Sequence, residues 1–314
     1  MTASPPADGP RLMLLDTASL YFRAYFGVPD SMRAPDGTPV NAVRGLMDFI
    51  SRLVADYRPT HLACCWDDDW RPQWRVDLIP SYKAHRLVAP RPGPTPDIEE
   101  VPDPLQKQVP IIREVLDAFG LAVVGAPEHE ADDVIGTLAT GAGMPVDIVT
   151  GDRDLFQLVD DEAQVRVLYT ARGVGRHERV TDQVVWDKYG VAAGQYADFA
   201  TLRGDTSDGL PGVPGVGEKT AATLLGRFGD MEGLLAAAAD PGSNLASGPR
   251  GKVKAAADYL AVAPKVVAVV RDLDLGSPDL TLPRTPADPD RVVELDRRYD
   301  LGSSAVRLVQ ALQG

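Results

Sequence analysis

Three short apolar runs, each followed closely by an aspartate, constrain the fold of this chain more than any other feature. Residues 12–15 precede Asp16, residues 61–66 precede Asp67, and residues 145–149 lead through Thr150 and Gly151 to Asp152. Short apolar runs that alternate with helical segments are typical of buried strands in a parallel sheet. Such sheets bind ligands at the carboxyl ends of their strands. We therefore expect an α/β fold, a mostly parallel sheet flanked by helices, with these aspartates close together.

The segments between these runs carry helical spacing. We expect helices over residues 19–25, 41–57 and 105–119, a helix that begins near Glu130, and a helix capped by Thr181. Further strands are expected at residues 121–124 and 165–168.

Additional acids occur in three short clusters. They are Glu130, Asp132 and Asp133, then Asp152 and Asp154, and later Asp205 and Asp208. Like charges held a few Å apart repel strongly in a cleft, so a chain that gathers them usually binds divalent cations there. Two alternatives stay open for the clusters taken alone. Acidic runs also occur on solvated helix faces, and carboxylates in a first helical turn stabilise the helix dipole.

Length and composition indicate an ordinary globular chain. Its 314 residues, 44% of them hydrophobic, suit one large domain or two modest ones. Residues 1–10 lack the apolar stretch of a signal peptide, and we expect a disordered tail there. Cys64 and Cys65 lie in a predicted core strand and indicate buried thiols in a reducing compartment, so we expect a cytoplasmic protein. The net charge of the chain is −13, and it would be about −4 without the nine acids that follow the predicted strands or form the three clusters. The net charge therefore does not exclude a nucleic-acid partner.

A long basic insertion follows the second predicted strand. Between residues 70 and 108 the basic side chains of Arg71, Arg75, Lys83, Arg86, Arg91 and Lys107 are interleaved with Trp70, Trp74 and Tyr82, and prolines are frequent. Such an insertion between core elements is typical of a functional loop or a mobile cover. A basic strip beside an acidic site suits a polyanion.

A glycine-rich hairpin opens a helix at residues 210–225. Gly212, Gly215 and Gly217 let the backbone approach a phosphate, and Lys219 and Thr220 follow at the helix start. A Walker A loop is excluded because Glu218 stands between Gly217 and Lys219, and no strand precedes the glycines as a dinucleotide fingerprint requires. A purely structural helix connector remains an alternative.

These motifs together resemble the 5′-nuclease superfamily of flap endonucleases, phage 5′-exonucleases and the 5′-nuclease domain of bacterial family A DNA polymerases. The bacterial group is most similar, and the resemblance runs from residue 12 to about residue 275. It rests on Leu14-Leu15-Asp16, Asn41-Ala42-Val43-Arg44-Gly45, Ser81-Tyr82-Lys83-Ala84, Glu130-Ala131-Asp132-Asp133, Gly151-Asp152-Arg153-Asp154, Gly204-Asp205-Thr206-Ser207-Asp208 and the glycine hairpin. From the length of 314 residues we expect a stand-alone nuclease without a polymerase segment.

The resemblance implies a PIN-like twisted sheet, a helical arch and a helix-three-turn-helix, of the helix-hairpin-helix type, that grips DNA. We expect a nuclease core at residues 11–180 with the arch at about 70–108. A helical region would follow at 181–275, with the helix-three-turn-helix at about 200–240. Residues 276–314 would pack back on the core.

The resemblance also implies residue roles. Asp16, Asp67, Glu130 and Asp132 would serve one metal, Asp152, Asp154, Asp205 and Asp208 a second, and Asp133 would lie between them or hold a further ion through water. Asp67 is preferred to Asp68 and Asp69 because it directly follows the strand, with a shift of one residue left open. Lys83 and Arg86 would contact the scissile phosphate, and Tyr82 would stack on a base. Arg23 and Arg75 would bind phosphates, together with the hairpin residues Gly212, Gly215, Gly217, Lys219 and Thr220.

The implied function is structure-specific cleavage of DNA at 5′ ends, nicks and flaps by two-metal-ion catalysis, in Okazaki fragment maturation and repair. Mg²⁺ or Mn²⁺ is expected because the site offers oxygen ligands, and the resemblance adds K⁺ at the glycine hairpin. We expect a monomer without membrane association. Two rivals remain: a haloacid-dehalogenase-like phosphatase, although that family has a second aspartate where this chain has Ala18, and a DNA-binding module without catalysis.

Overall fold

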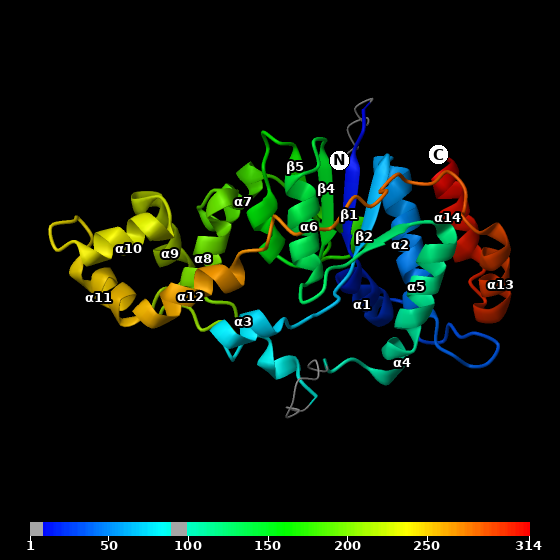
Figure 1. Ribbon diagram of the computed structural model, residues 1–314, viewed down its shortest axis with the longest axis horizontal. Coiled ribbons are helices and arrows are strands. Elements are labelled where there is room, and N and C mark those ends of the chain that lie inside the picture. The colour runs from blue at the N-terminus through cyan, green and yellow to red at the C-terminus, as the bar shows by residue number, and fades with distance from the viewer. Residues whose placement is uncertain (1–8, 89–98) are drawn as a thin grey trace.

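The computed structural model describes residues 9–88 and 99–314. The expected tail, except for Gly9 and Pro10, and the proline-rich part of the expected arch at residues 89–98 lie outside the described residues. Within the described residues the core is a six-stranded sheet in the order β3-β2-β1-β4-β5-β6 (Figure 1). The strands are β1 (Leu12–Asp16), β2 (His61–Cys65), β3 (Ala122–Val124), β4 (Val146–Thr150), β5 (Val165–Tyr169) and β6 (Glu178–Val180).

All neighbouring strands pair in parallel except β6, which runs antiparallel to β5. The expected α/β fold with a mostly parallel sheet is therefore confirmed. β1 lies at the centre, and its side chains alternate between the two faces. Leu12 and Leu14 belong to one core, whereas Met13 and Leu15 belong to the other. Because both faces are covered, β1 reads as a continuous apolar run.

Helices cover both faces of the sheet (Figure 1). In the described residues the α-helices are α1 (Thr17–Gly27), α2 (Asn41–Tyr57), α3 (Gln73–Leu78), α4 (Asp103–Gln106), α5 (Gln108–Phe119), α6 (Ala131–Thr140), α7 (Asp182–Tyr189), α8 (Tyr196–Arg203), α9 (Glu218–Phe228), α10 (Met231–Ala239), α11 (Ser247–Ala255), α12 (Ala257–Val267), α13 (Pro289–Tyr299) and α14 (Ser303–Gln313). Short 3₁₀ turns are η1 (Ala84–Arg86), η2 (Asp154–Leu158), η3 (Val174–Arg176) and η4 (Ala193–Gln195).

Several helices match the sequence-based expectation. α2 has the expected bounds, α6 begins directly after Glu130, and the Thr181 side chain caps α7 by accepting from Val184 N. The expected single helix at residues 105–119 is wrong, because α4 ends at Gln106 and α5 begins at Gln108. Pro110 explains the break, since it has no N–H to donate to the carbonyl of Gln106.

The C-terminal residues return to the sheet. Residues 280 and 282 exchange backbone hydrogen bonds with Leu62 and Thr60 at the start of β2. Helix α13 packs on α5 and α14 packs on α2. The boundaries that we expect at residues 180 and 275 stay predictions.

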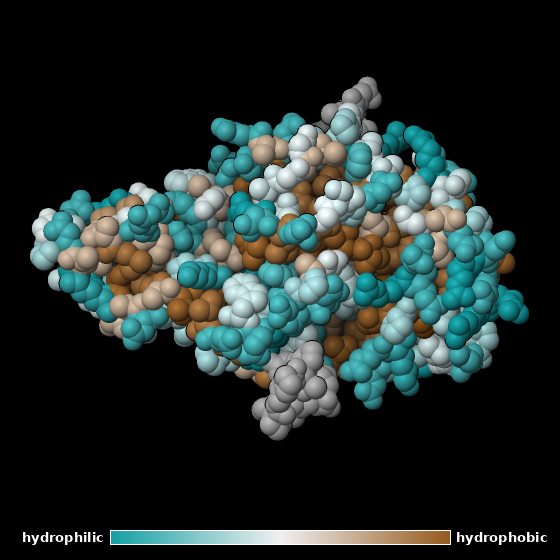
Figure 2. Space-filling view, viewed as in Figure 1, coloured by the Kyte–Doolittle hydropathy of each residue, from teal (hydrophilic) through white to brown (hydrophobic). Residues whose placement is uncertain are grey.

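Helices α8 to α12 extend away from the sheet at one end of the molecule (Figure 1). Hydrophilic side chains predominate over α3, α5 and α13 on the face that Figure 2 shows, with apolar patches between them. None of the helices in the described residues combines the length and the apolar character that a membrane span requires.

Candidate active site

Two strand ends bring Asp16 and Asp152 together. Asp16 ends β1 and caps α1, where its Oδ1 accepts from Ser19 N at 3.1 Å. Its Oδ2 accepts from Thr150 Oγ1 at 2.7 Å, and the same hydroxyl accepts from Asp152 N at 2.9 Å. Thr150 thus links the two aspartates. We did not identify Thr150 from the sequence, although a threonine at a strand end directly before Gly-Asp is a signal that could have indicated it.

Asp67 is the residue of the Asp67–Asp69 run that faces these strand ends. Its Oδ1 accepts from Ala131 N at 2.8 Å, in the first turn of α6. The Asp68 carboxylate instead lies against Gly125. Asp67 lines the cleft at these strand ends, and its role as a metal ligand stays a prediction.

A cleft of about 1100 Å³ brings together eight of the expected site residues. Its lining includes Asp16, Asp67, Glu130, Asp132, Asp152, Lys83, Arg86 and Arg23. A smaller cavity beside it is lined by Asp132, Asp154 and Asp208. Acids that are up to about 190 residues apart in the sequence thus lie around two adjoining hollows.

Burial and mutual repulsion raise the pKa of several of these carboxyl groups. The pKa of Asp16 is raised to about 7, mainly by burial and then by the charge of Asp67. Burial and the charge of Asp152 raise the pKa of Asp154, and burial and Asp16 raise that of Asp132. Burial raises the pKa of Asp208 to about 6, against the opposing effect of Lys83. A site that disfavours its own negative charges is suited to binding cations.

The carboxylates are not arranged as a ready-made set of cation ligands in the described residues. Across residues 9–88 and 99–314, no three acidic, imidazole or thiol groups stand in an arrangement that could hold a metal ion. Cation binding therefore requires side chains to turn. Asp205, for example, is bonded to Arg203 at 3.1 Å and to Ser207 N at 2.8 Å.

Residues 81–86 at the base of the expected arch dock on the loop that carries Asp205 and Asp208. Ser81 Oγ donates to Gly209 O at 2.8 Å, and Lys83 N donates to Asp208 O at 2.9 Å. The Arg86 guanidinium bonds Asp208 Oδ1 at 3.1 Å. Arg86 therefore lies at the acidic site, as expected, but its charge is paired with a carboxylate.

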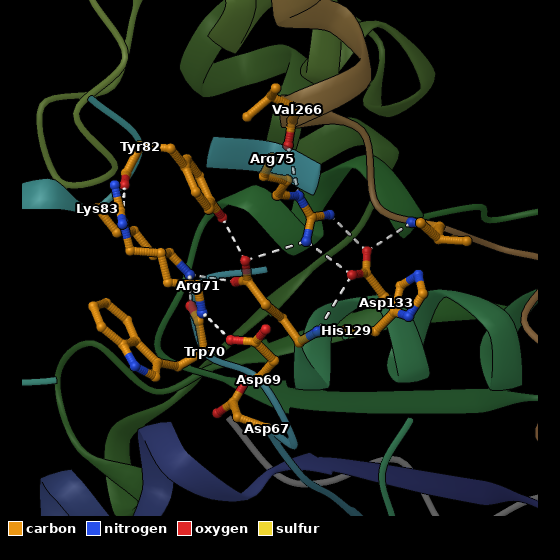
Figure 3. A network of polar contacts seen from close by, with 12 residues as sticks. Asp67, Asp69, Trp70, Arg71, Arg75, Tyr82, Lys83, His129, Asp133 and Val266 are labelled. Carbon is orange, nitrogen blue, oxygen red and sulfur yellow. Dashed lines mark hydrogen bonds and ion pairs between the residues drawn. The ribbon is translucent and has the colours of Figure 1, made fainter. Parts of the chain in front are cut away.

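Lys83 and Tyr82 converge on Glu130. Lys83 Nζ forms an ion pair with Glu130 Oε2, and Tyr82 OH donates to Glu130 Oε1 at 2.8 Å (Figure 3). Although burial lowers the pKa of Lys83, the Glu130 carboxylate raises it well above the usual value, so the lysine stays charged. Tyr82 is only 4% exposed. The expectation that Tyr82 stacks on a base is contradicted in this arrangement, because its ring is buried and its hydroxyl is bonded.

Arg75 and Asp133 are bonded to each other, and the structure contradicts the roles expected for both. The guanidinium makes two hydrogen bonds to the Asp133 carboxylate, at 2.7 and 2.8 Å (Figure 3). The Arg75 side chain is 3% exposed and that of Asp133 is fully buried. Arg75 is therefore not presented to a DNA phosphate, and Asp133 lines neither of the two hollows.

Arg23 keeps a position compatible with phosphate binding. It lines the large cleft, and one of its terminal nitrogens donates to Ala171 O at 3.3 Å. Its Nε is buried without a hydrogen-bond partner among the described residues.

The glycine hairpin joins α8 to α9. Gly212 and Gly215 have positive φ, of 67° and 75°, and Gly212 lies so close to the backbone of Gly204 that a Cβ would clash. Gly217 caps α9 with extended φ, Lys219 is exposed, and Thr220 is half-buried. Lys252 Nζ donates to Gly215 O at 2.7 Å. The hairpin is thus a tight turn that leads into α9, which lies outside the sheet.

Two family models match adjoining parts of the chain, from residue 11 to residue 290. The first, described as "5'-3' exonuclease, N-terminal resolvase-like domain", covers residues 11–190, and the second, "5'-3' exonuclease, C-terminal SAM fold", covers residues 191–290. A protein from Streptomyces coelicolor named "5'-3' exonuclease" is 60% identical over 96% of this chain and 99% of its own length. One of the same name from Mycobacterium tuberculosis is 53% identical over 96% and 97%.

A longer relative and two solved structures agree with these matches. DNA polymerase I of Mycobacterium bovis is 40% identical over 94% of this chain, which spans 31% of that protein. A solved complex of the phage T5 D15 flap endonuclease has a TM-score of 0.63 at 16% identity, over 97% of this chain and all of that chain. Flap endonuclease-1 from Methanococcus jannaschii scores 0.61 at 15% identity, over 96% and 92%. The PIN-like fold is therefore shared, and the phosphatase alternative is excluded. This chain belongs to the 5′-3′ exonuclease family of nucleases.

Proposed function

We propose that the protein is a structure-specific 5′ nuclease that hydrolyses DNA phosphodiesters at 5′ ends, nicks and 5′ flaps. One observation carries this proposal: Asp16, Asp67, Asp132 and Asp152 line a single cleft together with Lys83 and Arg86. Acids of this kind bind divalent cations, and the basic side chains suit a phosphate. The names of the relatives support the same activity.

Divalent cations fit the acidic residues. Asp154 Oδ1 is buried without a hydrogen-bond partner among the described residues, and Asp16, Asp132 and Asp208 have raised pKa values. Oxygen ligands without sulfur or nitrogen favour Mg²⁺ or Mn²⁺. We propose that Asp16, Asp67, Glu130 and Asp132 hold one cation and that Asp152, Asp154, Asp205 and Asp208 hold a second. Cations bound there would supply Lewis-acid stabilisation of the charge that develops during hydrolysis.

Lys83 and Arg86 would bind the reacting phosphate. Each is paired with a carboxylate, Lys83 with Glu130 and Arg86 with Asp208. Substrate binding therefore requires an exchange of partners, in which a phosphate oxygen replaces the carboxylate oxygen. A charged hydrogen bond to the phosphate would then stabilise the transition state.

DNA would be recognised by its shape. Arg23 in the cleft and the hairpin residues Gly212, Gly215, Gly217, Lys219 and Thr220 would contact backbone phosphates, which carry no sequence information. K⁺ at the hairpin would need carbonyl oxygens, and that of Gly215 already accepts from Lys252. We propose that the protein acts as a cytoplasmic monomer in Okazaki fragment maturation and repair, in keeping with its similarity to part of DNA polymerase I.

A cleavage assay on three DNA substrates tests the proposal. The protein is mixed with 5′-labelled flap, nicked and blunt duplexes of two unrelated sequences, with Mg²⁺ or with EDTA, and product lengths are measured. We expect Mg²⁺-dependent cleavage that follows the junction and not the sequence. DNA binding without cleavage in Mg²⁺ and Mn²⁺ would favour the non-catalytic alternative.

A further inference from the structure

Arg75 joins three parts of the chain that are distant in sequence. It lies on α3, at the base of the expected arch, and binds the Asp133 carboxylate on α6 with both terminal nitrogens. One of these nitrogens also donates to Glu130 Oε1 at 3.2 Å, and Nε donates to Val266 O at 3.1 Å in the last turn of α12. Four of the five N–H groups of the guanidinium are thus engaged by the protein itself.

Asp133 is equally occupied. Its Oδ1 accepts from Arg75 and from Val270 N at 2.9 Å, and its Oδ2 accepts from Arg75 and from Glu130 N at 3.4 Å. A carboxylate has about four positions for hydrogen-bond donors, so no acceptor position is left for a cation. Figure 3 shows Asp133 enclosed between Arg75 and the backbone that follows Val266.

The setting of Asp133 differs from that of the acids that face the clefts. Asp154 Oδ1 has no hydrogen-bond partner in the described residues, and Asp132 lines both hollows, whereas Asp133 lines neither. A carboxylate with a bidentate arginine partner needs no external cation for neutralisation. Asp133 therefore has the environment of a structural acid although it is adjacent to Asp132 in the sequence.

We propose that Arg75 and Asp133 are positioning residues that fix the Glu130 carboxylate toward the cation site and hold the arch base to α6 and to the segment after α12. The inference rests on the proposed function, because it takes Glu130 as a cation ligand. It assigns Asp133 a role outside the ligand set. Residues that orient a metal ligand without touching the metal typically contribute 10- to 100-fold in metal affinity.

The variant Arg75→Gln/Asp133→Asn tests the positioning role. It removes both charges together, so the net charge near Glu130 is unchanged, and it keeps hydrogen-bonding groups at both positions. Mn²⁺ binding to the intact protein is followed by electron paramagnetic resonance. We expect the same number of Mn²⁺ ions as in the wild type, with one of them bound about 10-fold more weakly or worse. Unchanged affinity, or a lower number of ions at saturation, would overturn the proposal.

Thermal unfolding in EDTA gives a second test, in which replacing Asp133 and replacing Asp132 should change the unfolding midpoint in opposite directions. Asp133→Asn should lower the unfolding midpoint by roughly 5 °C or more, because it leaves the buried Arg75 charge without its partner. The adjacent Asp132→Asn should raise the midpoint, because burial and the charge of Asp16 both disfavour the Asp132 carboxylate in the folded state. A rise with Asp133→Asn would overturn the proposal.

The double variant also covers the case in which the single variants do not fold. It leaves no unpaired charge, so its midpoint should lie well above that of either single variant. A double variant no more stable than the worse single variant would show that the two residues are not a coupled pair. Wild-type protein that binds Mn²⁺ but cuts no DNA would contradict the proposed function alone.

Discussion

The ammonium group of Lys83 forms a buried ion pair with the carboxylate of Glu130. The two side chains are 10% and 4% exposed, and Tyr82 and Arg75 bond the other carboxylate oxygen. Lys83 therefore acts as an internal counter-ion for Glu130. The residue proposed to bind the reacting phosphate also neutralises a proposed cation ligand.

Replacing Lys83 should slow cleavage more than binding. Lys83→Met removes the charge proposed to stabilise the reacting phosphate, so the single-turnover rate on a bound 5′ flap should fall about 100- to 1000-fold. The matched control is Lys188→Met, which alters an exposed lysine on α7. A Lys83→Met protein with the wild-type single-turnover rate would remove Lys83 from the chemistry.

Asp152→Asn should abolish cleavage and leave DNA binding largely intact. The amide keeps an oxygen that can accept from Asp154 N, as Asp152 Oδ1 does at 2.9 Å, but it loses the charge that a cation requires. Cleavage in Mg²⁺ and flap affinity in Ca²⁺ or EDTA are measured separately. Asp187→Asn, on the exposed face of α7, serves as the control. Normal turnover of Asp152→Asn in Mg²⁺ would count against the assignment.

Stability without metal should fall as the pH rises from about 5 to 7.5. Asp16 and Asp208 have folded-state pKa values of about 7 and about 6, above the usual 3.8, so the folded state binds more protons than the unfolded state in this window. The free energy of unfolding then decreases with increasing pH. Added Mg²⁺ should raise the unfolding midpoint more at pH 8 than at pH 5.

Comparison with Asp16→Asn isolates this effect from other titrating groups. The variant should show a shallower decrease of the midpoint in EDTA, because it cannot take up the extra proton. Identical slopes for the variant and the wild type would mean that Asp16 is not the titrating group.

Gly209→Ala should loosen the arch base. Gly209 has a φ of +70°, and a Cβ there would collide with the carbonyl oxygen of Ser81. We expect a loss of about 1–3 kcal/mol in the free energy of unfolding, measured by urea titration. In contrast, Gly226 is an exposed position of helix α9 with open space for a Cβ, so Gly226→Ala should raise the free energy of unfolding by about 0.5–1 kcal/mol. Equal effects at the two positions would refute this account of Gly209.

The sheet and the acidic residues at its edge could be predicted because their signals are local. Apolar runs and the acids after them identify β1, β2 and β4, and a parallel arrangement brings the strand ends together. The edge strand β6 has only three residues and gave no comparable signal. Predicting the break between α4 and α5 would have required attention to a single residue, Pro110.

The partners of the basic residues could not be read from the sequence. The local sequence does not distinguish Arg75, Tyr82 and Lys83, which all belong to a basic and aromatic segment. Their partners are set by tertiary contacts with Glu130, Asp133 and residues 266–270. Neighbouring acids such as Asp132 and Asp133 point to different environments because they occupy different faces of the same helical turn. Sequence gives their charge, whereas packing decides which one faces the cleft.

The most direct test of the central claim is anomalous diffraction from crystals soaked in Mn²⁺. We predict anomalous peaks among Asp16, Asp132, Asp152, Asp154 and Asp208, and none at Asp133. A well-ordered crystal at neutral pH without anomalous density among these carboxylates would contradict the account.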